Sequence, residues 1–248
     1  MTDDEMQSFA NWTNLSETTF LLTPSSPEAD YKLRIFTPFR ELPFAGHPTL
    51  GSAFAWVKNG GVPKKANFLV QECAIGLLPI QYENDSFQVK APALKRSGPL
   101  EEETFQHALE ILGLAPEDIV ASNWIENGPP WIGLVLHDAN AVLNVQPNMS
   151  LLSKYDLFLG IIGPHKNGNP ADFEVRAFAE NFEDPVCGSL NAAVATWLIC
   201  AKMAPPTYSV RQGTMVRRQG NVGLSTDENQ DIWLQGRCAA VIEGKVNI

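Results

Sequence analysis

The chain has 248 residues, of which 44% are hydrophobic and 19% are charged, and this composition supports a globular core without disulfides or structural metal. A formal net charge of −10, with no basic stripe, argues against nucleic acid as a partner. Because there is neither a signal-like N-terminus nor an apolar run of membrane-spanning length, we expect a cytoplasmic protein that binds no membrane and keeps four reduced thiols, Cys73, Cys187, Cys200 and Cys238.

The elements predicted along the chain alternate irregularly between helices and strands. A helix is expected at residues 4–13 and another around residues 105–112, where Gly113 ends it. Between them, the prolines and the glycine of residues 92–104 favour a linker. Hydrophobic runs predict strands at 33–37, 68–72, 75–82, 87–91, 131–136, 157–163 and 173–179, and a series of short strands from 208 to 242.

A repeat relates the two halves of the chain. With an offset of 142 positions, which places Arg34 on Arg176, six residue types coincide without a gap. Each copy reads as a strand, an acidic turn, a Pro-x-x-Gly segment and an apolar helix. The sequence therefore predicts two pseudo-symmetric lobes whose equivalent helix starts face each other across a central cleft. The coinciding pairs are Arg34/Arg176, Phe36/Phe178, Glu41/Glu183, Pro43/Pro185, Gly46/Gly188 and Ala53/Ala195.

The apolar helices of the two copies are expected at about residues 48–58 and 189–202. The second is apolar nearly all round, so we expect a curved sheet to enclose it. Gly46 and His47 open the first helix, and the Cys-Gly-Ser run 187–189 opens the second. Free N–H groups and the positive dipole end at such starts can hold a carboxylate, although the same residues could merely cap the helices.

Several motifs, in chain order, resemble those of the PhzF-like isomerases of phenazine biosynthesis. The resemblance covers essentially the whole chain, and its most specific part is the Glu-Leu-Pro-Phe-Ala-Gly-His-Pro run that begins at Glu41. The matching segments are Asn-Leu-Ser-Glu-Thr-Thr-Phe (14–20), Arg-Ile-Phe-Thr-Pro (34–38), residues 41–51, Glu-Asp-Pro-Val-Cys-Gly-Ser (183–189), Arg-Gln-Gly-Thr (211–214) and Val-Ile-Glu-Gly (241–244).

The resemblance implies an α+β fold like that of diaminopimelate epimerase, in which each of two pseudo-symmetric lobes is a curled, mostly antiparallel, barrel-like sheet around a central helix. We expect the N-terminal lobe at residues 1–97, the C-terminal lobe at 98–235, and a strand at 236–248 that returns to the first lobe. Family members are generally homodimers that use no metal and no organic cofactor. They usually begin with one more strand, so the first strand is expected to be missing here, which would leave a sheet edge unpaired.

The resemblance also assigns functional residues. Glu17 matches the glutamate that serves as general acid–base and moves a proton within a small anionic metabolite, which is a dihydro-hydroxyanthranilate in the phenazine enzyme. His47 and Asp184 match residues that bond the substrate or orient the shuttled proton. Burial in an apolar cleft, to which Leu15 and Phe20 could contribute, would raise the pKa of Glu17 towards neutrality.

The remaining matched positions line the substrate site. They are Gly46, Cys187, Gly188 and Ser189, whose helix starts would hold the substrate carboxylate. The three other histidines, His107, His137 and His165, have no metal-ligand spacing, and we expect no metal site.

Two other functions stay open at this point. In diaminopimelate-epimerase-like enzymes one cysteine from each lobe flanks the α-carbon, but the repeat places Ala45 opposite Cys187, so a symmetric two-thiol racemase is not expected. Glu17 and Cys187 could still act as the two bases of an amino-acid racemase, because a helix N-terminus lowers the pKa of a thiol. The chain could also be a non-catalytic, ligand-binding relative that lost its first strand.

Overall fold

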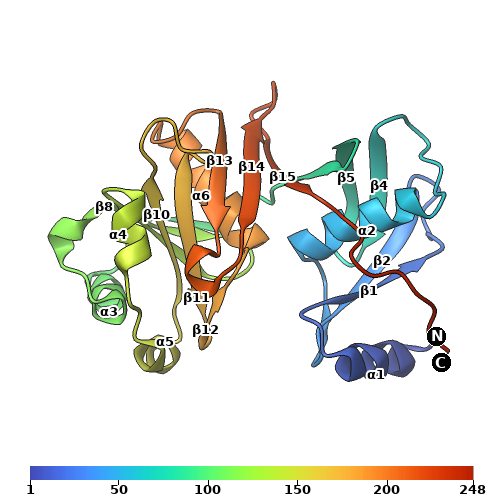
Figure 1. The fold of residues 1–248 in the computed structure, drawn as a ribbon, viewed down its shortest axis with the longest axis horizontal. Helices are drawn as coiled ribbons and strands as arrows, with labels where there is room; N and C mark the ends of the chain where they lie inside the picture. Colours follow the sequence, from blue (N-terminus) through green and yellow to red (C-terminus); the bar gives the residue numbers. More distant parts are fainter. Residues whose placement is uncertain (248) are drawn as a thin grey trace. The chain divides into compact units, whose positions relative to one another are not determined.

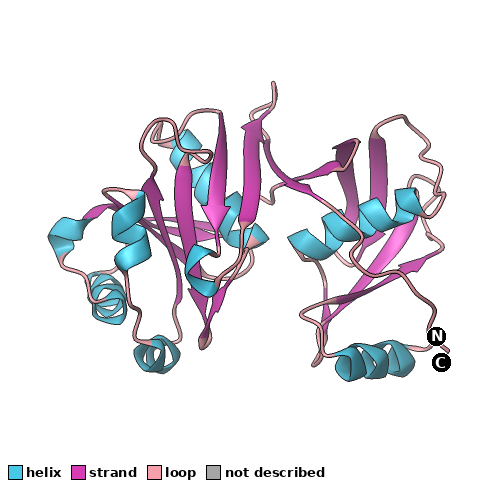
Figure 2. Ribbon diagram, in the orientation of Figure 1, coloured by secondary structure: helices cyan, strands magenta, loops and turns pink. Residues whose placement is uncertain are grey.

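The computed structural model describes residues 1–247 and consists of two compact units (Figures 1 and 2). Unit 1 comprises Met1–Lys90 together with the segment from Gln235 onward, and unit 2 comprises Ala91–Leu234. The predicted limits of the two lobes, 1–97 and 98–235, stay a prediction. Within the described residues, no helix combines the length and the apolar character that crossing a membrane requires.

Unit 1 is an open sheet packed on two helices. Its strand order is β1-β2-β4-β5-β6, with β3 added to β2. Strands β2 and β4 run parallel, and the other neighbouring strands run antiparallel. Helix α2 packs against β1, β2 and β6. The elements are α1 (Asp3–Thr13), β1 (Thr18–Leu22), β2 (Tyr31–Phe36), β3 (Glu41–Leu42), α2 (Gly46–Lys58), β4 (Phe68–Cys73), β5 (Gly76–Glu83) and β6 (Ser86–Lys90).

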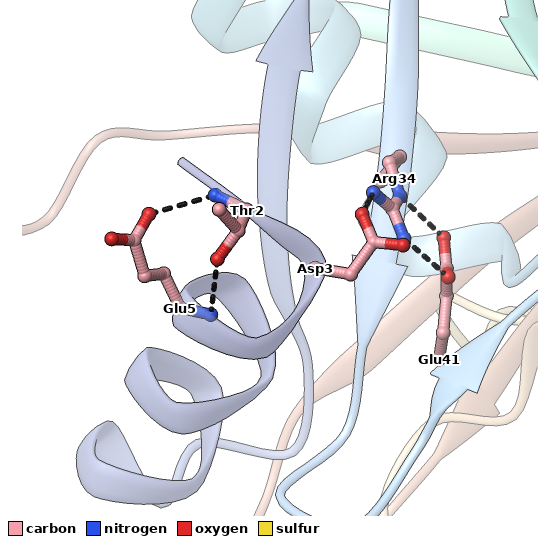
Figure 3. A network of polar contacts seen from close by, with 5 residues as sticks. All are labelled: Thr2, Asp3, Glu5, Arg34 and Glu41. Carbon is pink, nitrogen blue, oxygen red and sulfur yellow. Dashed lines mark hydrogen bonds and ion pairs between the residues drawn. The ribbon is translucent and has the colours of Figure 1, made fainter.

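Helix α1 begins where its sequence provides a complete N-terminal cap. The hydroxyl of Thr2 accepts from the backbone N–H of Glu5, and the carboxylate of Glu5 accepts from the backbone N–H of Thr2 (Figure 3). Its buried residues Met6 and Ala10 pack in a cluster with Phe36, against which Phe20 is also packed. This packing fixes α1 on the strands that follow it.

Unit 2 is a larger open sheet with helices on both faces. Its strand order is β14-β13-β11-β10-β9-β8-β7, with β12 added to β11. The elements are β7 (Arg96–Gly98), α3 (Glu102–Leu112), η1 (Pro116–Asp118), β8 (Ile119–Glu126), β9 (Trp131–Leu136), α4 (Ala139–Asn144), α5 (Met149–Tyr155), β10 (Phe158–Pro164), β11 (Phe173–Ala179), β12 (Phe182–Asp184), α6 (Gly188–Cys200), β13 (Thr207–Gln212), η2 (Thr214–Val216) and β14 (Gly220–Thr226); β15 (Ile232–Arg237) carries the chain from unit 2 back to unit 1.

Helix α6 packs closely against the strands of unit 2. It contacts β8, β9 and β14, and most of its residues from Leu190 to Leu198 are buried. A Cβ atom placed on Gly160 of β10 would lie 2.3 Å from the side chain of Leu190, so any larger residue there would force Leu190 to shift. The other face of the sheet carries a core of α3, α4 and α5 side chains, which includes Ile111, Val142 and Leu152.

The predicted fold class is confirmed in its essentials: it is α+β, with a mostly antiparallel sheet and a long helix, α2 or α6, in each unit. The strand path is open at both ends, so the sheet does not close into a barrel. The helices expected at 48–58 and 189–202 are α2 and α6, and the strands at 131–136 and 173–179 have the predicted bounds. The strand expected at 236–248 differs: β15 ends at Arg237, no strand follows through residue 247, and residue 248 lies outside the described residues.

The repeat is reproduced in side-chain geometry. In unit 1 the Arg34 guanidinium donates to both carboxylate oxygens of Glu41, at 2.7 and 2.7 Å (Figure 3). In unit 2 Arg176 donates to both oxygens of Glu183, at 3.0 and 2.8 Å. Each pair links the first strand of its copy to the short strand that pairs with it, in equivalent register. The two copies therefore build their acidic turn with the same bidentate bridge.

The third partner of each arginine differs between the units. In unit 1 Arg34 also donates to Asp3 of α1 at 2.5 Å (Figure 3), whereas in unit 2 Arg176 donates to the carbonyl oxygens of Val142 and Val145 at the end of α4. The repeated bridge thus ties a different neighbouring helix to each sheet.

A carboxylate on β4 predicts acid sensitivity of unit 1. The pKa of Glu72 is lowered to about 2 because its carboxylate accepts from the backbone N–H groups of Ser26 and Ser25 and pairs with Lys32. A lowered folded-state pKa contributes stability that is present above the ordinary glutamate pKa and is lost as the pH falls towards 2. We expect the urea midpoint of Glu72→Gln to fall less steeply below about pH 4.5 than that of the wild type. If the urea midpoints of the two proteins fall equally steeply with pH, the lowered pKa of Glu72 does not contribute to stability.

Candidate functional site

Glu17 lies in the short connection between α1 and β1 and is half-buried. Phe20 of β1, one of the two apolar residues expected near it, is half-buried and packs on Phe36 with ring centroids 5.5 Å apart. Leu15 is 59% exposed, so the expectation that it shelters Glu17 is wrong. Glu17 is therefore partly withdrawn from solvent at the start of the strand that carries Phe20.

Helix α2 begins at Gly46, and its N-cap residue Ala45 provides no side chain to cap the first turn. Gly46 is half-buried and His47 is exposed. The hydroxyl of Ser52 in α2 donates to the hydroxyl of Thr19 in β1 at 2.9 Å, which ties the helix to the strand that follows Glu17. In unit 1, Gly46 and His47 thus begin a helix that packs on β1, the strand directly after Glu17.

In unit 2 the candidate residues share one turn between β12 and α6. Asp184 ends β12, and its carboxylate accepts from the backbone N–H of Val186 at 3.1 Å. Cys187 is the N-cap of α6 and, like Ala45 in unit 1, offers no side-chain cap to the helix. Gly188 and Ser189 form the first turn. The structure thus brings Asp184, Cys187, Gly188 and Ser189 together.

Ser189 is held by two side chains, one directly after strand β8 and one at the start of β9. The indole N–H of Trp131 donates to the Ser189 hydroxyl at 3.0 Å, and the amide of Asn127 donates to the Ser189 carbonyl at 2.8 Å. The hydroxyl lies 3.4 Å from the sulfur of Cys187. These contacts fix the orientation of the first turn of α6.

The thiol of Cys187 does not have the lowered pKa expected from a helix start. Burial, and after it the nearby carboxylate of Asp184, raise the pKa of Cys187 to about 12. Loss of water around the sulfur therefore outweighs the helix dipole. At neutral pH Cys187 is a protonated, buried thiol, as expected of a small residue filling this corner.

Sequence reasoning missed Gln212, which ends β13 and is fully buried. Its side-chain oxygen accepts from the backbone N–H of Cys187 at 3.2 Å, and its side-chain N–H donates to the carbonyl of Asp184 at 2.9 Å. The only sequence signal was its membership of the Arg-Gln-Gly-Thr segment at 211–214, which gave it no role.

The three histidines outside the candidate site each contact a neighbouring residue. His107 stacks on Tyr155 with centroids 3.8 Å apart, His137 bonds the carbonyl of Glu117, and His165 bonds Glu174. All four cysteines are free, and residues 1–247 hold no group of three or more His, Cys, Asp or Glu side chains that could bind a metal ion.

Comparisons with known proteins agree with these motifs. The family described as phenazine biosynthesis-like protein, PhzC-PhzF, matches residues 1–244. "Antisense-enhancing sequence 1" of Schizosaccharomyces pombe is 35% identical, over 99% of this chain and 89% of that protein. "Trans-2,3-dihydro-3-hydroxyanthranilate isomerase" of Pseudomonas aeruginosa is 28% identical, over 99% of this chain and 89% of that protein. The crystal structure of a PhzF-family protein from Enterococcus faecalis has 25% identity and a TM-score of 0.75, covering 96% of this chain and 85% of that one. This chain therefore belongs to the phenazine biosynthesis-like, or PhzF, protein family.

Proposed function

We propose that this PhzF-family isomerase moves a proton between two carbons of a small cyclic carboxylate, with Glu17 as general acid–base. Support comes from the relative named as an isomerase of trans-2,3-dihydro-3-hydroxyanthranilate, which aligns over 99% of this chain. The observation that carries the proposal is the half-buried placement of Glu17 beside β1, because a general base must be partly withdrawn from water yet open to a substrate.

In the proposed reaction the Glu17 carboxylate takes a proton from one substrate carbon and returns it to another, and the double bond shifts between them. Atoms and electrons balance within the substrate, so the reaction needs no oxidant, metal or organic cofactor. Bound substrate would complete the burial of Glu17 and raise its pKa, which suits a group that both accepts and returns a proton.

We propose that the uncapped starts of α2 and α6 hold the substrate carboxylate through the N–H groups of Gly46, Gly188 and Ser189. His47 and Asp184 would orient the substrate or the shuttled proton. We further propose that the protein is cytoplasmic and forms a homodimer. Light scattering after size-exclusion chromatography tests the dimer by its molar mass.

Incubation of the purified chain with trans-2,3-dihydro-3-hydroxyanthranilate in D2O tests the proposal. We expect an isomer with deuterium at the carbon that receives the proton, by NMR and mass spectrometry, and undiminished turnover after dialysis against a chelator. If the chain folds but exchanges no carbon-bound hydrogen in this substrate or in a panel of cyclic and aliphatic carboxylates, a non-catalytic role replaces the isomerase.

The same experiment separates the racemase alternative. A Glu17/Cys187 racemase would need the thiol as a second base, and Cys187→Ala would then abolish deuterium uptake at a stereocentre. The raised pKa of Cys187 argues against that role, so we expect Cys187→Ala to keep its isomerisation rate within a few-fold. Loss of exchange in Cys187→Ala, at an unchanged melting temperature, would instead support the racemase.

A further inference from the structure

The side-chain amide of Gln212 clamps both ends of the turn that carries Asp184. Its N–H donates to the Asp184 carbonyl at 2.9 Å, and its oxygen accepts from the backbone N–H of Cys187 at 3.2 Å. Asn191, one turn into α6, donates to the same oxygen at 2.7 Å and to the Cys187 carbonyl at 2.8 Å. One buried amide therefore joins the end of β12 to the start of α6.

The chain around Gln212 is shaped to fit this turn. Gly213 has a φ of +89°, and a Cβ atom there would lie 2.6 Å from the carbonyl oxygen of Pro185. A Cβ on Gly220 of β14 would lie 2.2 Å from the side chain of Val186. Both glycines let β13 and β14 approach the turn so closely that the Gln212 amide can reach across it.

Unit 1 builds the same strand, turn and helix without such a clamp. β13 pairs with β11 so that Gln212 lies opposite Val175, whereas β4 pairs with β2 so that Gln71 lies opposite Tyr31. By the repeat offset of 142, Leu33 of β2 corresponds to Val175. Continuing the β2–β4 register by one residue places Cys73 opposite Leu33, so Cys73 stands at the position of Gln212. A thiol cannot both donate and accept across a turn as an amide does. Unit 1 does contain a buried amide, that of Gln71 in β4, but it donates to the hydroxyl of Thr49 in α2 at 3.3 Å, at the repeat position of Asn191. Contacts of one amide with both ends of the turn are therefore a feature of Gln212 in unit 2.

We propose that Gln212 is a positioning residue, which holds Asp184 and the first turn of α6 in the geometry that proton transfer requires. The inference rests on the proposed function, since it acts through Asp184 and the Cys187–Ser189 segment. The chemistry is specific: an amide donates to one end of the turn and accepts from the other, and leucine of similar size does neither.

Hydrogen exchange tests the clamp independently of any substrate. In Gln212→Leu we expect the backbone amide of Cys187 to exchange faster than in the wild type, by mass spectrometry or NMR, while the amides of α5 keep their protection. The matched control is Leu152→Ala, which opens a cavity in the core beneath α5 and lowers the melting temperature without touching the turn. Unchanged exchange at Cys187 in Gln212→Leu overturns the clamp.

Kinetics test its role in the reaction. We expect kcat of Gln212→Leu to fall about 10- to 100-fold, as small misplacements of reacting groups do. Leu152→Ala should keep kcat. The Gln212→Leu/Asp184→Asn double variant should be no slower than Asp184→Asn alone, because both changes remove the same contribution. Independent, multiplying losses would overturn action through Asp184.

The Gln212→Glu variant provides a pH-dependent rescue. A protonated glutamic acid can donate to the Asp184 carbonyl and accept from the Cys187 N–H, whereas its carboxylate cannot donate. The register partners Val175 and Gly220 add no charge, and the titratable side chains of the turn itself are those of Asp184 and Cys187. We expect the activity of Gln212→Glu relative to the wild type to rise as the pH falls.

The two proposals fail in different ways. A wild type that exchanges no carbon-bound hydrogen overturns the proposed function, and the catalytic role of Gln212 with it. An active wild type whose Gln212→Leu variant keeps its kcat overturns the positioning role alone.

Discussion

The Glu17→Gln variant is expected to lose about 10²- to 10⁴-fold in kcat for deuterium-traced isomerisation, the usual contribution of a general acid–base. Glutamine preserves the size of the side chain and one acceptor oxygen, but it cannot take or return a proton. Substrate binding should change little, because the proposed carboxylate contacts come from N–H groups of α2 and α6. The measurement is a single-turnover rate in D2O, together with the dissociation constant of the substrate by calorimetry.

The control is Glu28→Gln, which changes an exposed glutamate of unit 1 and alters net charge by the same amount. We expect wild-type rates from it, and melting temperatures that agree across all three proteins. A Glu17→Gln variant that turns over its substrate as fast as the wild type would remove Glu17 from the mechanism, although the chain would still belong to the same family.

The repeat was the part of the fold that sequence could predict best. Arg34 and Glu41, and their counterparts Arg176 and Glu183, lie seven residues apart in each copy, and this local spacing survives because each pair bridges two adjacent strands. The burial of helix α6 could also be predicted, since a helix that is apolar on every side must be enclosed by the rest of the protein. Local patterns of this kind record interactions that form within a short stretch of chain.

Longer-range interactions left little trace in the sequence. Gln212 follows Asp184 by 28 residues and reaches it only because β13 pairs with β11, in a parallel register that no local pattern encodes. The short helix α4 was missed as well, and its carbonyl oxygens are what Arg176 binds. The burial of Cys187 could not be predicted from the sequence either. A helix start by itself lowers the pKa of a thiol, but burial at Cys187 raises the pKa instead.

Removal of Arg176 should destabilise the protein far more than removal of its repeat partner Arg34. The Arg176 side chain is 3% exposed and that of Glu183 is 11% exposed, whereas the Arg34 partners Asp3 and Glu41 are 80% and 38% exposed. Arg176→Met strands a buried carboxylate and the carbonyl oxygens at the end of α4, which costs about 3–5 kcal/mol. Arg34→Met breaks contacts that water can replace, which costs up to about 1 kcal/mol.

Urea unfolding followed by circular dichroism and by tryptophan fluorescence measures the difference between the two arginine variants. The Arg176→Met/Glu183→Leu double variant should recover part of the loss, since the stranded charge is then gone, although the two helix carbonyls stay unpaired. Equal destabilisation by Arg34→Met and Arg176→Met would mean that the two bridges contribute alike despite their different exposure. If the double variant is no more stable than Arg176→Met, the whole loss of stability comes from the unpaired carbonyl oxygens of α4. In unit 2 the repeated arginine would then stabilise the protein by capping the end of that helix, and its bridge to Glu183 would add nothing to stability.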